Sequence, residues 1–179
     1  MTARPALNHV GIFVRELEPM VSFYRDALAM VVTDRGTTFD RDVAFLSSDP
    51  AHHHQLVLAE GRGPGQPSTL CQLSFLLPDL AALRSVVNTL AALDVTPTRL
   101  ANHGTSWSVY AEDPEANPIE LYVNTPWYVS QPRAERLDLN MSDEQIWAAT
   151  EAMCRQDPTF KSMQTWSHEL ALATGRQQT

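Results

Sequence analysis

The chain has 179 residues, of which 44% are hydrophobic, so it can bury one sizeable core or two half-cores that share an interface. Its formal net charge of -8 argues against nucleic-acid binding, and no apolar run approaches the roughly 18 residues of a membrane span. Only Cys71 and Cys154 are present and the N-terminal stretch lacks the apolar region of a signal peptide. We therefore expect a cytoplasmic protein without disulfides, with no nucleic acid and no membrane as partner.

The first half of the chain predicts strands around one helix. Residues 7–14 (LNHVGIFV) are typical of a strand, and residues 17–30 (LEPMVSFYRDALAM) carry apolar side chains at helical spacing. Further strands are predicted at 43–48 (VAFLSS) and 52–60 (HHHQLVLAE). The glycine- and proline-rich stretch 61–68 (GRGPGQPS) predicts a break after them.

After this break the same order of elements returns. Residues 71–77 (CQLSFLL) predict a strand and residues 78–93 (PDLAALRSVVNTLAAL) a helix. Strands are then expected near 95–100 (VTPTRL), 106–113 (SWSVYAED) and 118–123 (PIELYV).

One offset of 63 residues relates the two halves, since it takes His9 to Gln72 and Val57 to Glu120. The apolar residues that coincide in this register are Val10 with Leu73, Ile12 with Phe75, Val14 with Leu77, Leu17 with Leu80, Met20 with Leu83, and Tyr24 with Val87. The register predicts an α+β domain over residues 1–130, built from two βαβββ modules at about 6–62 and 69–125. A chance similarity of two amphipathic patterns is the alternative.

Residues 131–179 form a predicted helical extension. Ser142 followed by Gln145 is a capping-box signal, which predicts a helix over 142–155, and residues 158–174 predict a second helix. Helices this short need a partner surface. The sequence leaves open whether they pack on the modules, cover a cleft or join two subunits.

Three polar residues stand out because they occupy strands with apolar neighbours. His9 lies in the first strand, Gln72 is its counterpart in the repeat, and Glu120 lies between Ile119 and Leu121. A buried carboxylate without a partner costs several kcal/mol or becomes protonated. A divalent metal would account for all three, because imidazole, amide oxygen and carboxylate are plausible ligands. Alternatively, His9 is a hydrogen-bonded core residue, Gln72 forms only hydrogen bonds, and Glu120 faces solvent on an edge strand.

Two stretches carry a family resemblance that covers about residues 6–130. NHVGIFVRELEPMVSFYRDAL and NHGTSWSVYAEDPEANPIELYVNTPWYV resemble the vicinal oxygen chelate superfamily, and within it the small type I extradiol catechol dioxygenases. The resemblance implies an open barrel of paired modules that holds Fe(II), or Mn(II), in a cleft through two His and one Glu. Carried over by position, the ligands are His9, Gln72 and Glu120, where Gln72 departs from the pattern.

The resemblance also implies roles for residues near the metal. His54, with His53 as second choice, corresponds to an acid/base histidine, His103 to a second pocket histidine, and Tyr110 to a tyrosine that hydrogen-bonds the substrate. The alternatives are that the three adjacent histidines mark an exposed strand end and that Tyr110 serves in ordinary core packing. Val57 stands where glyoxalase I would have a fourth ligand, which leaves at most three.

Ala116 is a second departure, since the resemblance places glycine before this Asn. Alanine is strained at positive φ, so we expect an adjusted turn in which Asn117 takes the left-handed conformation.

The resulting expectation is an iron-dependent extradiol dioxygenase that acts on a dihydroxybiphenyl-like catechol with O2. The expected partners are this aromatic diol, O2 and further copies of the chain in a homo-oligomer. Two alternatives stay open: a lyase, isomerase or epimerase that uses a non-redox metal, and a metal-free protein that binds a small molecule.

Overall fold

The computed structural model describes residues 5–175, and the contacts within it divide the chain into two units. The described part of the first unit comprises residues 5–71 and 112–117, and that of the second comprises residues 72–111 and 118–175. The turn at 112–117 therefore belongs to the first unit, although the strands on either side of it belong mainly to the second.

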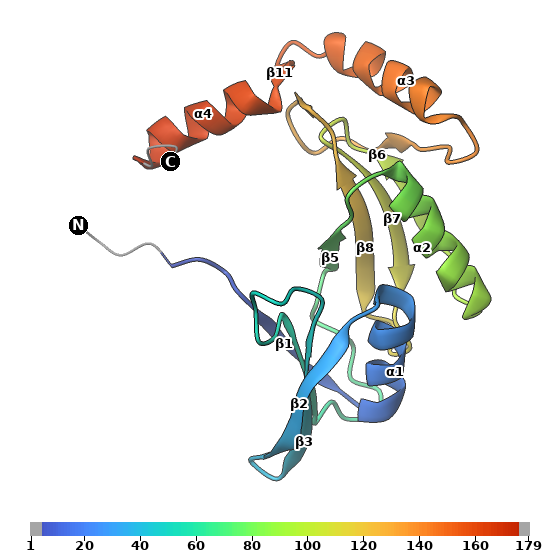
Figure 1. Ribbon diagram of the computed structural model, residues 1–179, viewed down its shortest axis with the longest axis vertical. Helices are drawn as coiled ribbons and strands as arrows, with labels where there is room; N and C mark the ends of the chain where they lie inside the picture. Colours follow the sequence, from blue (N-terminus) through green and yellow to red (C-terminus); the bar gives the residue numbers. More distant parts are fainter. Residues whose placement is uncertain (1–4, 176–179) are drawn as a thin grey trace. The chain divides into compact units, whose positions relative to one another are not determined.

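The first unit is a four-stranded sheet with one helix (Figure 1). Its elements are β1 (Val10–Val14), α1 (Leu17–Leu28), β2 (Val31–Thr38), β3 (Arg41–Ser47) and β4 (Leu56–Glu60). The strands lie in the order β1-β4-β3-β2, and only the β1–β4 pair is parallel. Met20, Val21 and Tyr24 of α1 are buried, as are Leu56 and Leu58 of β4, so apolar burial between helix and sheet forms the core of this unit.

The second unit repeats this plan and adds the C-terminal helices. Its elements are β5 (Leu73–Leu76), α2 (Leu80–Ala92), β6 (Arg99–Asn102), β7 (Ser106–Glu112), β8 (Pro118–Asn124), β9 (Trp127–Tyr128), β10 (Glu135–Arg136), α3 (Asp143–Arg155), β11 (Lys161–Ser162) and α4 (Met163–Thr174). The sheet order is β10-β6-β7-β8-β5, with β5 parallel to β8. Figure 1 shows α2 alongside β7 and β8.

The sheet of the second unit has two different faces. Successive side chains of a strand point to opposite faces, and Trp107, Val109, Ile119 and Leu121 are all fully buried on one of them. The residues between them on β7 and β8 include Tyr110 and the buried carboxylate Glu120, on the opposite, polar face.

The predicted fold class and the repeat are confirmed. Val10 of β1 pairs with Leu56, and Leu73 of β5 pairs with Ile119, so both units pair their strands at the predicted offset of 63. Residues 31–38 form β2, which the sequence did not suggest because VVTDRGTT lacks an apolar alternation. The domain and module boundaries stay predictions.

The C-terminal region begins as its capping signal predicts. Ser142 accepts a hydrogen bond from the backbone of Gln145, whose side chain accepts one from the Ser142 backbone, so the capping box of α3 is confirmed. Thr150 of α3 is buried and accepts hydrogen bonds from Asn102 and Trp107, both 2.8 Å long. These bonds attach α3 to the sheet of the second unit. In contrast, α4 buries no residue.

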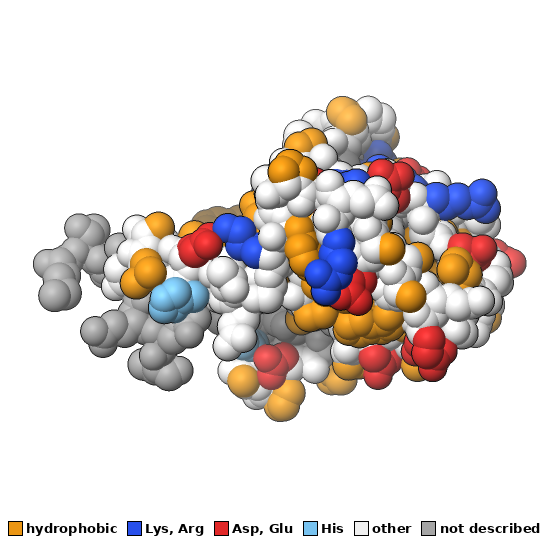
Figure 2. Space-filling model, turned by 90° about the horizontal axis from the view of Figure 1, so that it is seen from above, with side chains coloured by type: hydrophobic (Ala, Val, Ile, Leu, Met, Phe, Trp, Pro, Cys, Tyr) orange, Lys and Arg blue, Asp and Glu red, His pale blue; other side chains and the backbone are white. Residues whose placement is uncertain are grey.

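Two findings bear on the surface. No helix within residues 5–175 is long and apolar enough to cross a membrane. The face drawn in Figure 2 mixes acidic, basic and apolar side chains, so the chain's negative charge is not gathered there into one patch.

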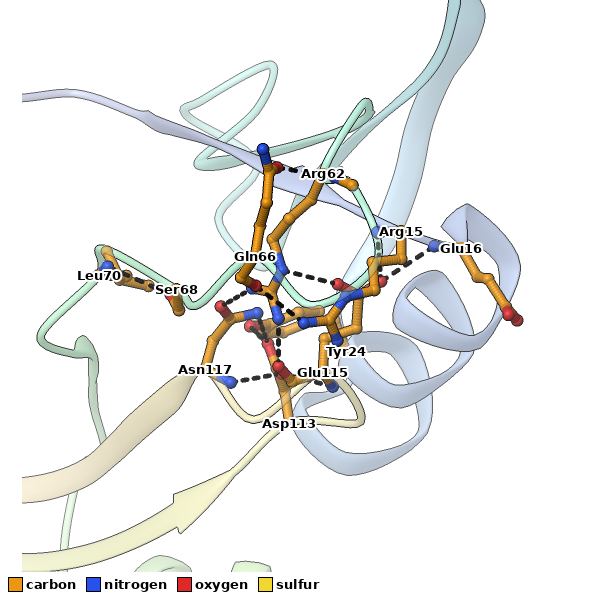
Figure 3. Close-up of polar contacts among 11 residues, drawn as sticks. Arg15, Glu16, Tyr24, Arg62, Gln66, Ser68, Leu70, Asp113, Glu115 and Asn117 are labelled. Carbon is orange, nitrogen blue, oxygen red and sulfur yellow. Dashed lines mark hydrogen bonds and ion pairs between the residues drawn. The ribbon is translucent and has the colours of Figure 1, made fainter.

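The turn at 112–117 is organised around Asp113 (Figure 3). One oxygen of this buried carboxylate accepts the backbone N–H groups of Glu115 and Asn117, both at 2.9 Å. The other accepts the Asn117 side chain at 2.8 Å and the Tyr24 hydroxyl at 2.9 Å. Burial, followed by the charge and hydrogen bond of Asp113, raises the pKa of Tyr24, so the phenol keeps the proton that it donates.

A second set of contacts fixes the same turn from outside. Glu115 accepts the backbone N–H groups of Arg15 and Glu16, between β1 and α1. The buried guanidinium of Arg62 donates to the Asn117 side chain at 2.7 Å and to the Glu115 carbonyl, and its Nε lies 3.4 Å from the Glu115 carboxylate (Figure 3). All of these contacts lie within the first unit, where they hold the turn at 112–117 against residues 15–16 and 62.

The expected adjustment at Ala116 is wrong. Ala116 itself adopts the left-handed conformation, with φ of 59°, and Asn117 does not. The physical reason is that Asn117 is held by Asp113 and Arg62, which leaves Ala116 to make the turn despite the steric cost of its Cβ.

We predict that Ala116→Gly raises the free energy of unfolding by about 0.5–1 kcal/mol, because glycine removes the left-handed strain at a modest entropic cost. Ala148→Gly, at an exposed position inside α3, is the matched control and should lower stability by about 1 kcal/mol. Urea unfolding measures both; a loss of stability in Ala116→Gly would contradict the turn geometry.

Asp113→Asn should lower the free energy of unfolding by about 2–4 kcal/mol, because the new amide group faces donors and leaves them unpaired. Asp94→Asn, at an exposed residue with φ of 57°, should change stability by less than about 0.5 kcal/mol. Equal urea midpoints for Asp113→Asn and the wild type would argue against this network.

Candidate functional site

Glu120 is the centre of the polar face in the second unit. It is only 8% exposed, and β8 lies between β7 and β5, so the alternative of a solvent-facing edge residue is wrong. One carboxylate oxygen accepts Ser74 at 2.7 Å and Gln72 at 2.8 Å, and the other accepts the Tyr110 hydroxyl at 2.7 Å. Ser74 is in place because it pairs directly with Glu120 in the parallel β5–β8 register.

These donors decide the charge of Glu120. Burial alone would raise the pKa of its carboxyl group, but hydrogen bonds from Ser74 and Tyr110 and the nearby His103 outweigh it, and the net result is a lowered pKa. Glu120 is therefore ionised at neutral pH, inside a mostly apolar sheet.

Tyr110 links Glu120 to His103. The His103 Nε2 lies 2.9 Å from the Tyr110 oxygen, and its Nδ1 bonds the backbone carbonyl of Arg133. A carbonyl only accepts, so Nδ1 carries a proton. Burial and the hydrogen bond to Glu120 raise the pKa of Tyr110, so the phenol stays protonated.

Tyr110 thus connects the carboxylate with the imidazole. It has one proton, and donating it to the ionised Glu120 leaves its oxygen lone pairs for His103. The arrangement is an imidazole and a carboxylate joined through one phenol.

Gln72 contributes its amide nitrogen to this site. Its Nε2 donates to Glu120 and, at 2.9 Å, to Ser74. An amide nitrogen does not ligate a metal, so here Gln72 acts as a hydrogen-bond donor. This agrees with the alternative that Gln72 forms hydrogen bonds. Ligation through its oxygen stays a prediction.

The first unit has a separate group of histidines. His9 precedes β1 and is exposed, so the alternative of a core histidine is wrong. The His9 and His54 rings lie 4.4 Å apart between centroids, and the His53 and His54 Nδ1 atoms are 2.9 Å apart. His53 turns its Nε2 to Asp34 at 2.8 Å. Of the two candidates, His54 is thus the one beside His9.

The environment of His54 favours its neutral form. Its Nδ1 shares one hydrogen bond with the Nδ1 of His53, and the direction of this bond depends on the tautomers of the two rings. Burial first, then the charges of His9 and His53, lower the pKa of His54, which is therefore neutral at pH 7.

The donor types fit a divalent metal of the iron or manganese kind: an exposed imidazole in the first unit, and an ionised carboxylate in the second. Taken singly, neither unit gathers three His, Cys, Asp or Glu side chains of residues 5–175 into a group able to hold a metal. His9 belongs to the first unit and Gln72 and Glu120 to the second, so the triad stays a prediction.

Several contributing residues were not predicted. The sequence could have predicted Ser74, because the register that places Gln72 on the face opposite the apolar one also places Ser74, two residues later, beside Glu120. No such signal exists for Asp34, since β2 was not predicted. Arg99, whose guanidinium carbon lies 4.2 Å from the Tyr110 ring centroid, depends on cross-strand pairing of β6 with β7.

Two curated relatives are dioxygenases of Rhodococcus globerulus. Biphenyl-2,3-diol 1,2-dioxygenase 3 is 28% identical over 130 residues, which cover 69% of this chain and 66% of that protein. Biphenyl-2,3-diol 1,2-dioxygenase 2 is 25% identical over 168 residues, covering 84% and 86% respectively. The chain thus spans about two thirds of the length of the first relative.

Solved structures agree in fold. A glyoxylase/bleomycin resistance protein/dioxygenase domain from Frankia sp. EAN1pec has a TM-score of 0.61 at 21% identity, covering 69% of this chain and 94% of that one. A mutant of the fosfomycin resistance protein FosX from Listeria monocytogenes, in complex with Mn(II) and 1S,2S-dihydroxypropylphosphonic acid, has a TM-score of 0.57 at 16% identity, covering 69% and 95%. At these identities the likeness extends to the fold alone.

A family profile matches residues 6–121, which span both modules and end just after Glu120. Together with the two modules at one offset, this match shows that the chain belongs to the Glyoxalase/Bleomycin resistance protein/Dioxygenase superfamily.

Proposed function

We propose that the chain is an extradiol ring-cleaving dioxygenase that acts on a catechol-type aromatic diol. The observation that carries the proposal is the ionised carboxylate of Glu120, joined through the Tyr110 hydroxyl to the imidazole of His103. It provides one metal-ligand oxygen and two proton-bearing groups on one face of a sheet. The two dioxygenase relatives, at 28% and 25% identity, support the same chemistry.

His9 and Glu120 would hold the metal, with Gln72 as a third ligand if its amide turns. Fe(II) is proposed because the named relatives are dioxygenases, and Mn(II) is the alternative. When bound, such a metal supplies a Lewis acid and a redox centre that brings a diol and O2 together.

The chain's own residues would move the protons. A neutral His54 has one ring nitrogen with a lone pair, which is suited to accept a proton from a catechol hydroxyl. Tyr110 and His103 present O–H and N–H groups that can stabilise negative charge on substrate oxygens and return a proton. In the overall reaction, one O2 adds to one catechol and the bond beside the diol opens, giving a muconic semialdehyde type of product.

Gln72 supports a second candidate, a metal-free protein that binds a small molecule. Its amide nitrogen helps satisfy Glu120 without any cation, so the carboxylate has a stable arrangement of its own. A lyase or isomerase with a non-redox metal is the third candidate, in keeping with the fold it shares with FosX.

We predict near-stoichiometric Fe or Mn in protein purified without oxygen, and O2 uptake with a yellow product on a catechol panel. In His9→Ala and in Glu120→Ala the metal content should fall at least about tenfold, because each variant removes a ligand. Elemental analysis and an oxygen electrode measure both. His168→Ala, on α4, is the matched control and should retain metal and activity.

Other outcomes select the other candidates. Zn or Ni without O2 uptake would move the proposal to a lyase or isomerase. Absence of metal in the wild type after reconstitution would leave the metal-free binding protein.

Tyr110→Phe should lower kcat for catechol cleavage about 100-fold, because it removes the hydroxyl that joins Glu120 to His103, while the metal content stays unchanged. Tyr128→Phe, whose ring stacks on Trp166, is the control and should retain the wild-type rate. An unchanged kcat in Tyr110→Phe would assign Tyr110 to packing.

A further inference from the structure

Arg99 extends the polar face of the second unit beyond Glu120. It lies on β6 directly opposite Tyr110 on β7, and its guanidinium stacks over the Tyr110 ring at 4.2 Å. The hydroxyl of this same ring bonds Glu120. The guanidinium and the carboxylate are thus separated by about one phenol ring, a span that a single aromatic molecule can bridge.

Arg99 has no acidic partner, in a chain with net charge -8. Among residues 5–175 it forms no ion pair, whereas most arginines of the described chain do, including Arg84, Arg133 and Arg155. A guanidinium on a polar sheet face without a carboxylate partner keeps its full capacity to bind an anion.

A second arginine lies on the same face. In the β10–β6 pairing, Arg136 is opposite Ala101, two residues from Arg99, and opposed residues of an antiparallel pair share a face. Within the described residues, Arg136 also lacks an ion pair and is exposed. Within residues 5–175, the edge of the sheet nearest Arg99 therefore carries two arginines that form no ion pair, while Glu135, the other residue of β10, pairs with Arg133 at 4.0 Å.

A cavity of about 680 Å³ adjoins these groups. Arg99, His103 and Arg133 line it together with Gln131, Pro132 and Ala134. Arg133 already binds Asp157 at 2.9 Å, so Arg99 is the cation of the cavity that is free to bind a ligand. His103 connects this cavity with Tyr110 and Glu120.

We propose that Arg99 binds the carboxylate of an aromatic substrate, so that the preferred substrates of this chain are catechols with a carboxylate side group. This proposal rests on the proposed function for the diol end of the substrate, but the anion site itself does not require the chemistry. The substrate proposed for this chain thus carries a charge, whereas the two relatives are named for biphenyl-2,3-diol, which is uncharged.

The stacked geometry supports a role in recognition. The planar guanidinium stacks on the Tyr110 ring. Burial raises the pKa of Tyr110 overall, while the charge of the guanidinium and a hydrogen bond from it act to lower this pKa. A guanidinium has five N–H groups, so others are left for a charge-assisted bond to a carboxylate. An uncharged aryl group would leave this cation without a partner.

The first test is binding of 3-hydroxybenzoate, which is not a diol, compared with 3-hydroxybenzamide, which has nearly the same shape and no charge. Calorimetry on the full chain should give tighter binding of the carboxylate, and Arg99→Met should weaken it about 10- to 100-fold, the range of a charge-assisted bidentate bond. Methionine keeps the apolar stem of the side chain. Amide binding should change less than about threefold.

Arg155→Met, at an exposed arginine on α3, is the matched control and should leave both ligands unaffected. Equal losses of carboxylate and amide binding in Arg99→Met would mean that Arg99 only supports the Tyr110 ring, and would overturn the proposal. Equal affinity of the wild type for the two ligands would do the same.

Turnover of 3,4-dihydroxybenzoate and 3,4-dihydroxybenzamide separates this proposal from the proposed function. Cleavage of both with no preference for the acid would retain the dioxygenase and overturn the Arg99 site. Arg99-dependent binding of 3-hydroxybenzoate without cleavage of any catechol would retain the anion site and overturn the dioxygenase.

Discussion

The need to keep a carboxylate ionised inside a sheet governs the second unit. Glu120 is almost wholly removed from water, and a buried charge destabilises the fold unless hydrogen bonds replace its hydration. The strand order supplies them: β5 brings Ser74 from one side and β7 brings Tyr110 from the other. A slip of one residue in either strand would turn Glu120 or its donors toward the apolar face.

The turn before β8 has a separate hydrogen-bond network within the first unit. Residues 112–117 alternate between buried and exposed, with Asp113, Glu115 and Asn117 buried. Asp113 closes the turn on itself, while Glu115 and Asn117 bind Arg62. Residues 112–117 of the motif that carried the family resemblance are therefore fixed by hydrogen bonds of their own, and Glu120 follows three residues later.

The sequence predicted the features that follow from periodicity. The offset of 63 predicted the pairing of the first and last strands in each unit, because apolar burial imposes the same pattern twice. The sequence motif predicted the wrong residue for the left-handed turn. One of the hydrogen bonds that hold Asn117 comes from Arg62, which is distant in the sequence.

Other features depend on side-chain direction rather than on pattern. The histidines at 52–54 precede β4 instead of belonging to it, so strand alternation does not select among them. Only the contact with Asp34 turns His53 away and leaves His54 beside His9. Likewise, the amide of Gln72 can present oxygen or nitrogen, and the neighbouring carboxylate favours nitrogen.

The charge of the chain and the charge of the polar face have opposite signs, and this contrast has a physical consequence. A net charge of -8 repels anions at long range, but salt screens that repulsion beyond roughly 8–10 Å. Within this distance Arg99 and Arg136 act on a ligand without an acidic neighbour paired to them. The arrangement would slow the approach of an anionic ligand slightly yet favour its retention, so selectivity for anions would arise from contact with Arg99 rather than from electrostatic steering.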